Sequence, residues 1–321
     1  MGRLATLFYS LCLAVLALFA VQPAAAQYYN QDRLAELLYA QRDSVDFLPE
    51  VNYRYFVMEH ETNNSIYARH QLYLAMGDGD VQRGRDQIPF LEFLTRKKVD
   101  RLAIGDTIIL PEPLGLDLRA YAPFPRFYPA SEEIGKIVII HLAVQAWAAY
   151  EDGRLLRWGL VNTGRPGYRT PGGRYNFNWR TLERISSESP EGEEWLMRWV
   201  FNFYNERGFH THQYAMPMGA PASHGCVRMI TADAKWLYSW ADPWVTTAGR
   251  GAMGGNIQKQ GTMVLVLGDG DEPSGPPPRF LNLPDGPERI VVELPEDPYS
   301  VRPGSGQQRF FDSRRAQSAS R

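Results

Sequence analysis

A cysteine with histidines gathered around it is the strongest chemical signal in this 321-residue chain. Cys226 lies two residues after His224, and His210 and His212 lie a short loop upstream, so three of the six histidines fall within seventeen residues of that thiol. A thiol becomes a nucleophile when a neighbouring base, an arginine or a helix N-terminus raises its thiolate fraction. The pattern therefore predicts a reactive cysteine.

The neighbours of Cys226 supply the other parts of an acyl-transfer site. Gly225 lacks a side chain, so the backbone N–H groups of Gly225 and Cys226 could face a substrate carbonyl and form an oxyanion hole. Arg228 could bind a substrate carboxylate. We interpret residues 221–229 as a site for acyl transfer through a covalent thioester, although a free cysteine is by default a buried apolar residue.

A metal site is the main alternative from chemistry alone. His210-x-His212 together with His224-x-Cys226 offers four ligands of the type that zinc accepts. A structural zinc site usually pairs cysteines, and this spacing matches no zinc signature. We therefore expect neither a metal nor another cofactor.

The elements that must position these residues form a β-rich pattern. Apolar runs separated by turn residues predict strands at 136–142, 146–150, 155–161, 195–204 and 261–267. An extended segment at 209–214 would place His210 and His212 on one face. Thr231 is expected to cap a helix that continues to Trp240, so that Cys226 lies just before a helix start. The predicted fold class is mainly β (a β-rich α+β domain), with a short helix after the cysteine motif.

A second, smaller region precedes this domain. The chain is long enough for two domains, and the prolines and aromatic residues of 110–128 predict a boundary near residue 128. Residues 27–128 are expected to be a small α+β region, with helices and strands at 32–42, 53–59, 88–94 and 102–111. The domain with the cysteine motif then spans 129–268.

Two further segments lack the pattern of regular structure. Residues 183–194 are polar, with Ser and Glu repeated, and predict a solvated loop. Residues 269–321 are rich in proline and poor in apolar runs, which predicts a disordered tail.

The first 26 residues are typical of a secretory signal peptide. A positive start at Arg3 is followed by an apolar run and by small residues before Gln27. We expect cleavage and export to the periplasm or cell envelope, with an uncleaved membrane anchor as the alternative. A net charge of −2, with both signs interspersed, gives no electrostatic footprint for nucleic acid.

The residues 223–228, Ser-His-Gly-Cys-Val-Arg, resemble the signature of the L,D-transpeptidase catalytic domain (YkuD type). The turns Thr163-Gly164-Arg165 and Thr170-Pro171-Gly172-Gly173 are similar to upstream turns of that family, and the resemblance covers roughly residues 134–268. It implies a YkuD-like β-sandwich catalytic domain.

The resemblance implies peptidoglycan chemistry. Cys226 would attack the amide after the L-centre of the diamino acid at stem position three, release D-alanine, and pass the acyl group to an amine. Gly225 and Cys226 would supply oxyanion donors, His224 would support the site, and Ser223 and Arg228 would bind the substrate. The implied partners are donor and acceptor stem peptides of peptidoglycan, or an envelope protein as acceptor.

Two other functions are compatible with the same residues. If water is the acceptor, the enzyme would be an L,D-carboxypeptidase or an amidase-type hydrolase. A protein of another class, a non-catalytic cell-wall-binding protein, would keep His210 and His212 as core residues. The run at 102–111 also resembles the end of a LysM-type glycan-binding module, so that residues 27–128 would be a degenerate LysM-like region.

The resemblance leaves the proton carrier open between two histidines. The family places an upstream histidine in a Gly-x-x-x-His-Gly context, which favours His212 after Gly208, although Gln213 replaces the second glycine. The usual separation from the cysteine favours His210 instead. We expect His212 to serve.

Overall fold

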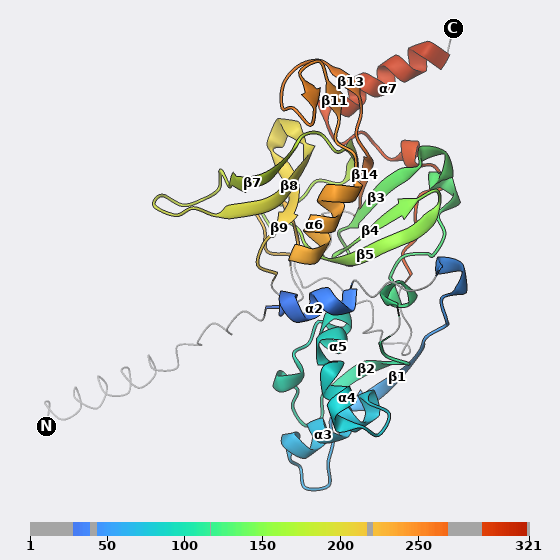
Figure 1. Ribbon diagram of the computed structural model, residues 1–321, viewed down its shortest axis with the longest axis vertical. Helices are drawn as coiled ribbons and strands as arrows, with labels where there is room; N and C mark the ends of the chain where they lie inside the picture. Colours follow the sequence, from blue (N-terminus) through green and yellow to red (C-terminus); the bar gives the residue numbers. More distant parts are fainter. Residues whose placement is uncertain (1–27, 39–43, 116, 217–220, 269–290, 320–321) are drawn as a thin grey trace, which may run out of the picture.

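The computed structural model describes residues 28–38, 44–115, 117–216, 221–268 and 291–319, and Figure 1 shows their arrangement. The predicted signal peptide, 1–26, lies outside the described residues. In the described part of the chain, no helix combines the length and the apolar composition needed to cross a bilayer.

In the described residues the largest sheet has nine strands and carries the cysteine motif. Most of its neighbouring strands run antiparallel, but β14 is parallel to β3 and β10 is parallel to β9. In spatial order the strands are β6 (Gly173–Asn176), β14 (Met263–Leu267), β3 (Lys136–His141), β4 (Ala146–Glu151), β5 (Arg154–Asn162), β10 (Val227–Met229), β9 (Phe209–Gln213), β8 (Leu196–Tyr204) and β7 (Arg180–Ile185). The predicted mainly β fold is confirmed.

The sheet curls around a core that contains α6 (Thr231–Trp240), the helix expected after the motif. Val138 and Trp147 from one half of the sheet share a buried cluster with Phe201 and Val227 from the other half, and with Leu237 of α6. Because side chains alternate between the two faces of a strand, the opposite face of β3 and β4 must be covered by something else.

That cover is the N-terminal region. Ile137, Ile139 and Tyr150 on the second face of β3 and β4 pack in one cluster with Phe90 and Phe93. Burial on both faces explains why β3 reads as an unbroken apolar run rather than as an alternating one.

The N-terminal region is a small α+β unit, as predicted. β1 and β2 pair antiparallel, and the helices α3 to α5 lie between them in the chain. Its elements are α2 (Gln31–Leu38), β1 (Asn52–Val57), α3 (Ser65–Met76), α4 (Val81–Asp86), α5 (Ile88–Thr95) and β2 (Thr107–Glu112). The helix α3 was not expected from the sequence, although its buried Ala68, Leu72 and Met76 recur every four residues along one face. Of the helix expected at 32–42, residues 39–43 lie outside the described residues.

The loop predicted at 183–194 begins later than expected. β7 continues to Ile185 and pairs with Leu196, so residues 183–185 belong to a strand. The side chains from Leu182 to Ile185 are exposed. A strand whose side chains face water accepts polar residues, so the hydrophobic pattern does not reveal β7. Figure 1 shows this β7–β8 hairpin projecting from the body of the domain.

Shorter elements connect the main ones. A small sheet of β11 (Val245–Thr246), β12 (Gly249–Arg250) and β13 (Ile257–Lys259) follows α6. The 3-10 helices are η1 (Val45–Phe47), η2 (Val99–Arg101), η3 (Leu118–Tyr121), η4 (Pro129–Ile134), η5 (Asn205–Arg207) and η6 (Pro298–Ser300).

Part of the segment that the sequence analysis placed in a disordered tail has regular structure. Residues 291–319 contain η6 and α7 (Gly306–Ala319), whereas 269–290 lie outside the described residues. The backbone of Arg174 in β6 donates to the Arg302 carbonyl at 2.8 Å and accepts from the Gly304 N–H at 2.9 Å. The guanidinium of Arg174, 2% exposed, also binds Gln308 and Asp312 of α7. These contacts lie more than 120 residues apart in the chain, so composition could not reveal them.

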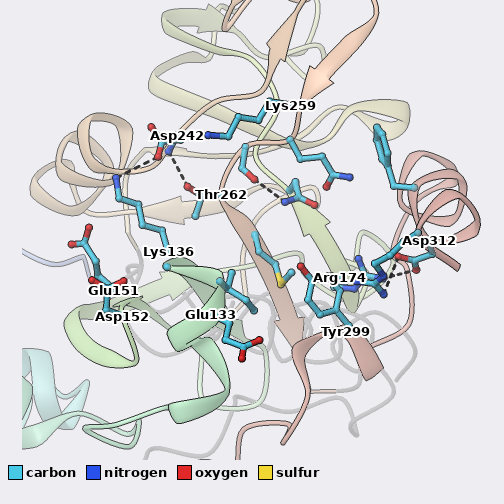
Figure 2. A pocket seen from close by; sticks show the side chains of 18 residues that line it. Glu133, Lys136, Glu151, Asp152, Arg174, Asp242, Lys259, Thr262, Tyr299 and Asp312 are labelled. Atoms are coloured by element: carbon cyan, nitrogen blue, oxygen red, sulfur yellow. Dashed lines mark hydrogen bonds and ion pairs between the residues drawn. The ribbon is translucent and has the colours of Figure 1, made fainter. Parts of the chain in front are cut away.

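A cavity of about 650 Å³ lies beside these contacts, and Figure 2 shows Arg174, Tyr299 and Asp312 together on one of its walls. Lys136 and Asp242 lie on the opposite side, 3.4 Å apart. The arginine and the lysine named here are thus each paired with a carboxylate of the same cavity.

We predict that Asp312→Ala lowers the free energy of unfolding by about 1–3 kcal/mol, because it leaves the buried Arg174 guanidinium without its anionic acceptor. Urea denaturation followed by circular dichroism measures the change. Arg309→Ala, an exposed position on the same helix, is the control, and an equal loss in both variants would contradict the prediction.

Candidate active site

The thiol lies at the end of a tight turn that only glycine permits. Gly225 has a φ of +113°, and a Cβ at this position would lie 2.5 Å from the Phe209 ring. The hydroxyl of Ser223 accepts from the Gly225 N–H at 3.1 Å and donates to the Cys226 carbonyl. Thr170 Oγ1 donates to the Gly225 carbonyl at 2.7 Å. The turn is therefore held on both sides, and β10 begins at the next residue.

These bonds change two of the expected roles. Ser223, 1% exposed, uses its hydroxyl as donor and acceptor inside the turn, so its bonds hold the backbone and not a substrate. The Gly225 N–H points to the Ser223 hydroxyl and is not available as an oxyanion donor. The Cys226 N–H stays the predicted donor for a substrate carbonyl.

The imidazole in contact with the thiol is that of His210. Cys226 Sγ lies 3.6 Å from His210 Nδ1, because β10 runs parallel to β9 with Val227 opposite Thr211. His212 is buried one pair further along, where its Nδ1 contacts the Gln213 carbonyl oxygen at 2.9 Å. The glycine context favoured His212, but the ring in contact with the thiol is that of His210. Strand register, and not local sequence context, decides which ring reaches Sγ.

Burial keeps both groups neutral. It raises the pKa of Cys226 to about 11, and this outweighs the lowering by a hydrogen bond with the backbone of His210 and by the charge of Arg228. Burial lowers the pKa of His210 to about 3, helped by the charges of His212 and Arg184. Near neutral pH the site therefore holds a thiol and a neutral imidazole, whose Nδ1 is the acceptor for the S–H proton.

His224 lines a small cleft next to Cys226 and is not a second base for the thiol. Its Nε2 lies 2.8 Å from Arg165 Nη2, and since a guanidinium only donates, this nitrogen is the acceptor. The ring stacks on Trp195 at 5.8 Å and meets the edge of Tyr168 at 4.6 Å. Burial and the charge of Arg165 lower the pKa of His224. His224 therefore supports the site through its contacts with Arg165, Tyr168 and Trp195.

Arg228 faces the same cleft without an acidic partner. Its half-buried guanidinium lies over the Tyr214 ring at 4.5 Å, and among the described residues no carboxylate lies within ion-pair distance of it. The cleft has a volume of about 40 Å³ and is lined by Ser186, Glu188, Trp195, Met197, His212, Tyr214, Ser223, His224, Cys226 and Arg228. A cleft this small holds only the reacting part of a ligand.

The four residues considered as zinc ligands do not point toward one common centre. In the described part of the chain, no group of three or more His, Cys, Asp or Glu side chains is placed to hold a metal ion. His224 turns toward Arg165, and His212 toward the backbone of Gln213.

The sequence analysis missed several residues that build this site. Trp195 was not assigned a role from the sequence, and its ring stacks on that of His224. Thr231 is not the cap of α6: the cap is Ile230, and Gln31 accepts from the Thr231 N–H at 2.8 Å. The Gln31 amide also donates to the Tyr214 carbonyl at 2.9 Å, so α2 supports the strand end beside Arg228. No pattern in the sequence joins residues nearly 200 positions apart.

The β10 strand also separates the thiol from the helix. Cys226 is followed by Val227–Met229 in extended form, and α6 begins only at Thr231. The helix expected from Thr231 to Trp240 is present with those bounds, and one short strand lies between it and the thiol.

The domain that contains the cysteine motif matches a known protein family. Residues 135–266 fit the family model of the L,D-transpeptidase catalytic domain, YkuD. Residues 135–266 are a YkuD domain. No curated protein matches the chain.

Several solved structures are similar to this chain over part of their length. An L,D-transpeptidase from Stackebrandtia nassauensis is 24% identical, with a TM-score of 0.33, over 44% of this chain and 58% of that one. An L,D-transpeptidase from Mycobacterium smegmatis is 16% identical (TM-score 0.33; 42% and 59% covered), and one from Mycobacterium tuberculosis H37Rv is 18% identical (TM-score 0.31; 42% and 58% covered). This chain thus matches less than two thirds of the length of these proteins.

The neutral thiol predicts the pH dependence of alkylation in the YkuD domain. Because the pKa of Cys226 is about 11, the rate of reaction with iodoacetamide should rise about tenfold per pH unit from pH 6 to 9 without a plateau. Mass spectrometry of carboxamidomethylated Cys226 measures the rate. A plateau near pH 7 would indicate a thiolate–imidazolium pair and contradict the assignment.

The contact geometry predicts different effects for the two upstream histidines. His210→Gln should slow acylation of Cys226 on the order of 100-fold, because the proton of the thiol loses its acceptor. His212→Gln should slow it less. The rate of acyl-enzyme formation is measured by mass spectrometry on samples quenched at successive times, with variants of matched thermal unfolding. An equal loss of rate in both variants would refute the assignment to His210.

Proposed function

We propose that the YkuD domain is a cysteine L,D-transpeptidase that acts on peptidoglycan stem peptides in the periplasm or cell envelope. The observation that carries the proposal is the contact of Cys226 Sγ with His210 Nδ1 at 3.6 Å, in a cleft that is also lined by Arg228. The family match supports the same reaction class.

Acylation follows from the neutral pair. Sγ attacks the carbonyl carbon of the donor amide while the S–H proton passes to His210 Nδ1. The oxyanion is stabilised by the Cys226 N–H. When the C–N bond breaks, the proton on His210 passes to the nitrogen of the leaving D-alanine, and a thioester on Cys226 remains.

Deacylation reverses these roles. The amine of an acceptor stem, or of an envelope protein, attacks the thioester carbonyl and gives its proton to His210. Collapse of the tetrahedral intermediate breaks the C–S bond, and the sulfur takes the proton back from His210. The product is a new amide, and the thiol and the imidazole return to their neutral forms.

Incubation of the purified protein with a disaccharide tetrapeptide tests the proposal. Intact-mass spectrometry should show an adduct equal to the donor minus one D-alanine, which Cys226→Ala abolishes. Cross-linked dimers should then appear. Adduct formation followed only by a tripeptide product would make the protein a hydrolase, and no adduct in the folded wild type would overturn the proposal in favour of a wall-binding role.

A further inference from the structure

Three arginines from three separate elements lie on residues of the Cys226 site or next to them, and each lies over an aromatic ring. Arg165, in the loop before β6, lies 4.7 Å from the centre of the Tyr168 ring. Arg184 in β7 lies 5.2 Å from that of Trp179. With Arg228 over Tyr214, they form what we call the arginine rim, Arg165, Arg184 and Arg228.

Arg184 connects to the reacting groups through packed rings. Trp179, on which its guanidinium lies, meets the edge of His210 at 5.1 Å, and His210 contacts Cys226. Across the hairpin, Arg184 pairs in register with Met197, a residue of the cleft wall. Arg184 is therefore close to the thiol, although nothing in the motif around Cys226 predicts it.

The arginine rim has no counterions in the described part of the chain. None of its three members lies within 4.0 Å of a carboxylate, whereas the neighbouring residues Arg198 and Glu183 of the same hairpin pair at 3.1 Å. Glu188 is the one carboxylate among the residues that line the cleft. Positive charge is thus held beside the thiol by aromatic rings, which attract cations without neutralising them.

A partly buried cation without a partner favours an anionic ligand. Arg228 is half-buried and its pKa is lowered by that burial, so binding of an anion would compensate the lost hydration. Guanidinium groups bind carboxylates through two parallel hydrogen bonds. A stem peptide carries a carboxylate on the side chain of its diamino acid when that group is not amidated, close to the carbonyl that Cys226 attacks.

We propose that the arginine rim makes the site selective for acyl donors whose diamino acid has a free side-chain carboxylate, with Arg184 and Arg228 as its binding residues. This rests on the proposed function for the identity of the donor. The selectivity for negative charge next to the thiol is a property of the cleft, and it can be measured without a peptide.

The first experiment uses two alkylating probes of nearly equal size. Iodoacetate is anionic and iodoacetamide is neutral, so the ratio of their rates at Cys226, divided by the ratio for free N-acetylcysteine, reports the local charge. This normalised ratio should exceed one by on the order of tenfold at low salt and decrease with added NaCl. Arg184→Gln should reduce it severalfold, whereas Arg198→Gln, the paired neighbour on the hairpin, should leave it unchanged.

The second experiment compares two disaccharide tetrapeptides that differ only in that carboxylate, one free and one a carboxamide. The wild type should acylate with the carboxylate donor on the order of tenfold faster than with the carboxamide, and Arg184→Gln should reduce this ratio of rates severalfold. Equal rates for both donors in the wild type, or equal loss with both in Arg184→Gln, would overturn the inference and leave the proposed function intact. Failure of both donors to acylate Cys226 would overturn the proposed function, and a normalised iodoacetate ratio of one would overturn the selectivity for negative charge independently.

Discussion

The Ser223 hydroxyl joins the Gly225 N–H to the Cys226 carbonyl, and this one group closes the turn from which the thiol projects. The turn leads directly into β10, whose parallel pairing with β9 sets the distance between Cys226 and His210. A residue with a side chain at position 225 would collide with Phe209, so the turn has few alternative shapes. The contact between nucleophile and base is therefore a consequence of backbone geometry.

The burial of the Cys226 sulfur determines the electrostatics of the cleft. A sulfur held below the surface is costly to ionise, and this effect dominates the nearby positive charges, so the pKa of Cys226 is about 11. In the proposed mechanism a neutral thiol needs a base at the moment of attack, and a pKa of about 3 leaves His210 Nδ1 unprotonated for that role. The positive charges around the pair are then free to act on the substrate.

Both ends of the described chain support the catalytic domain. Gln31 binds the Tyr214 carbonyl and the first turn of α6, and thereby holds the strand end beneath Arg228. At the other edge of the sheet, residues 302–304 lie along β6 and satisfy backbone groups that an edge strand would expose. The N-terminal region covers the second face of β3 and β4. The domain is thus completed by segments outside the 135–266 match.

The amino-acid sequence alone determined the cysteine motif, the strands from 136 to 161 and the helix that ends at Trp240, because these depend on neighbours in the chain: apolar runs, turn residues and a glycine without a side chain. It also indicated the family, through six consecutive residues. Only the tertiary structure decided that His210 and not His212 meets the thiol, that Ser223 holds the turn, and that Arg184 lies over Trp179, whose ring meets His210. These depend on strand register and on side chains brought together across the sheet, and residue spacing along one strand contains no information about its partner.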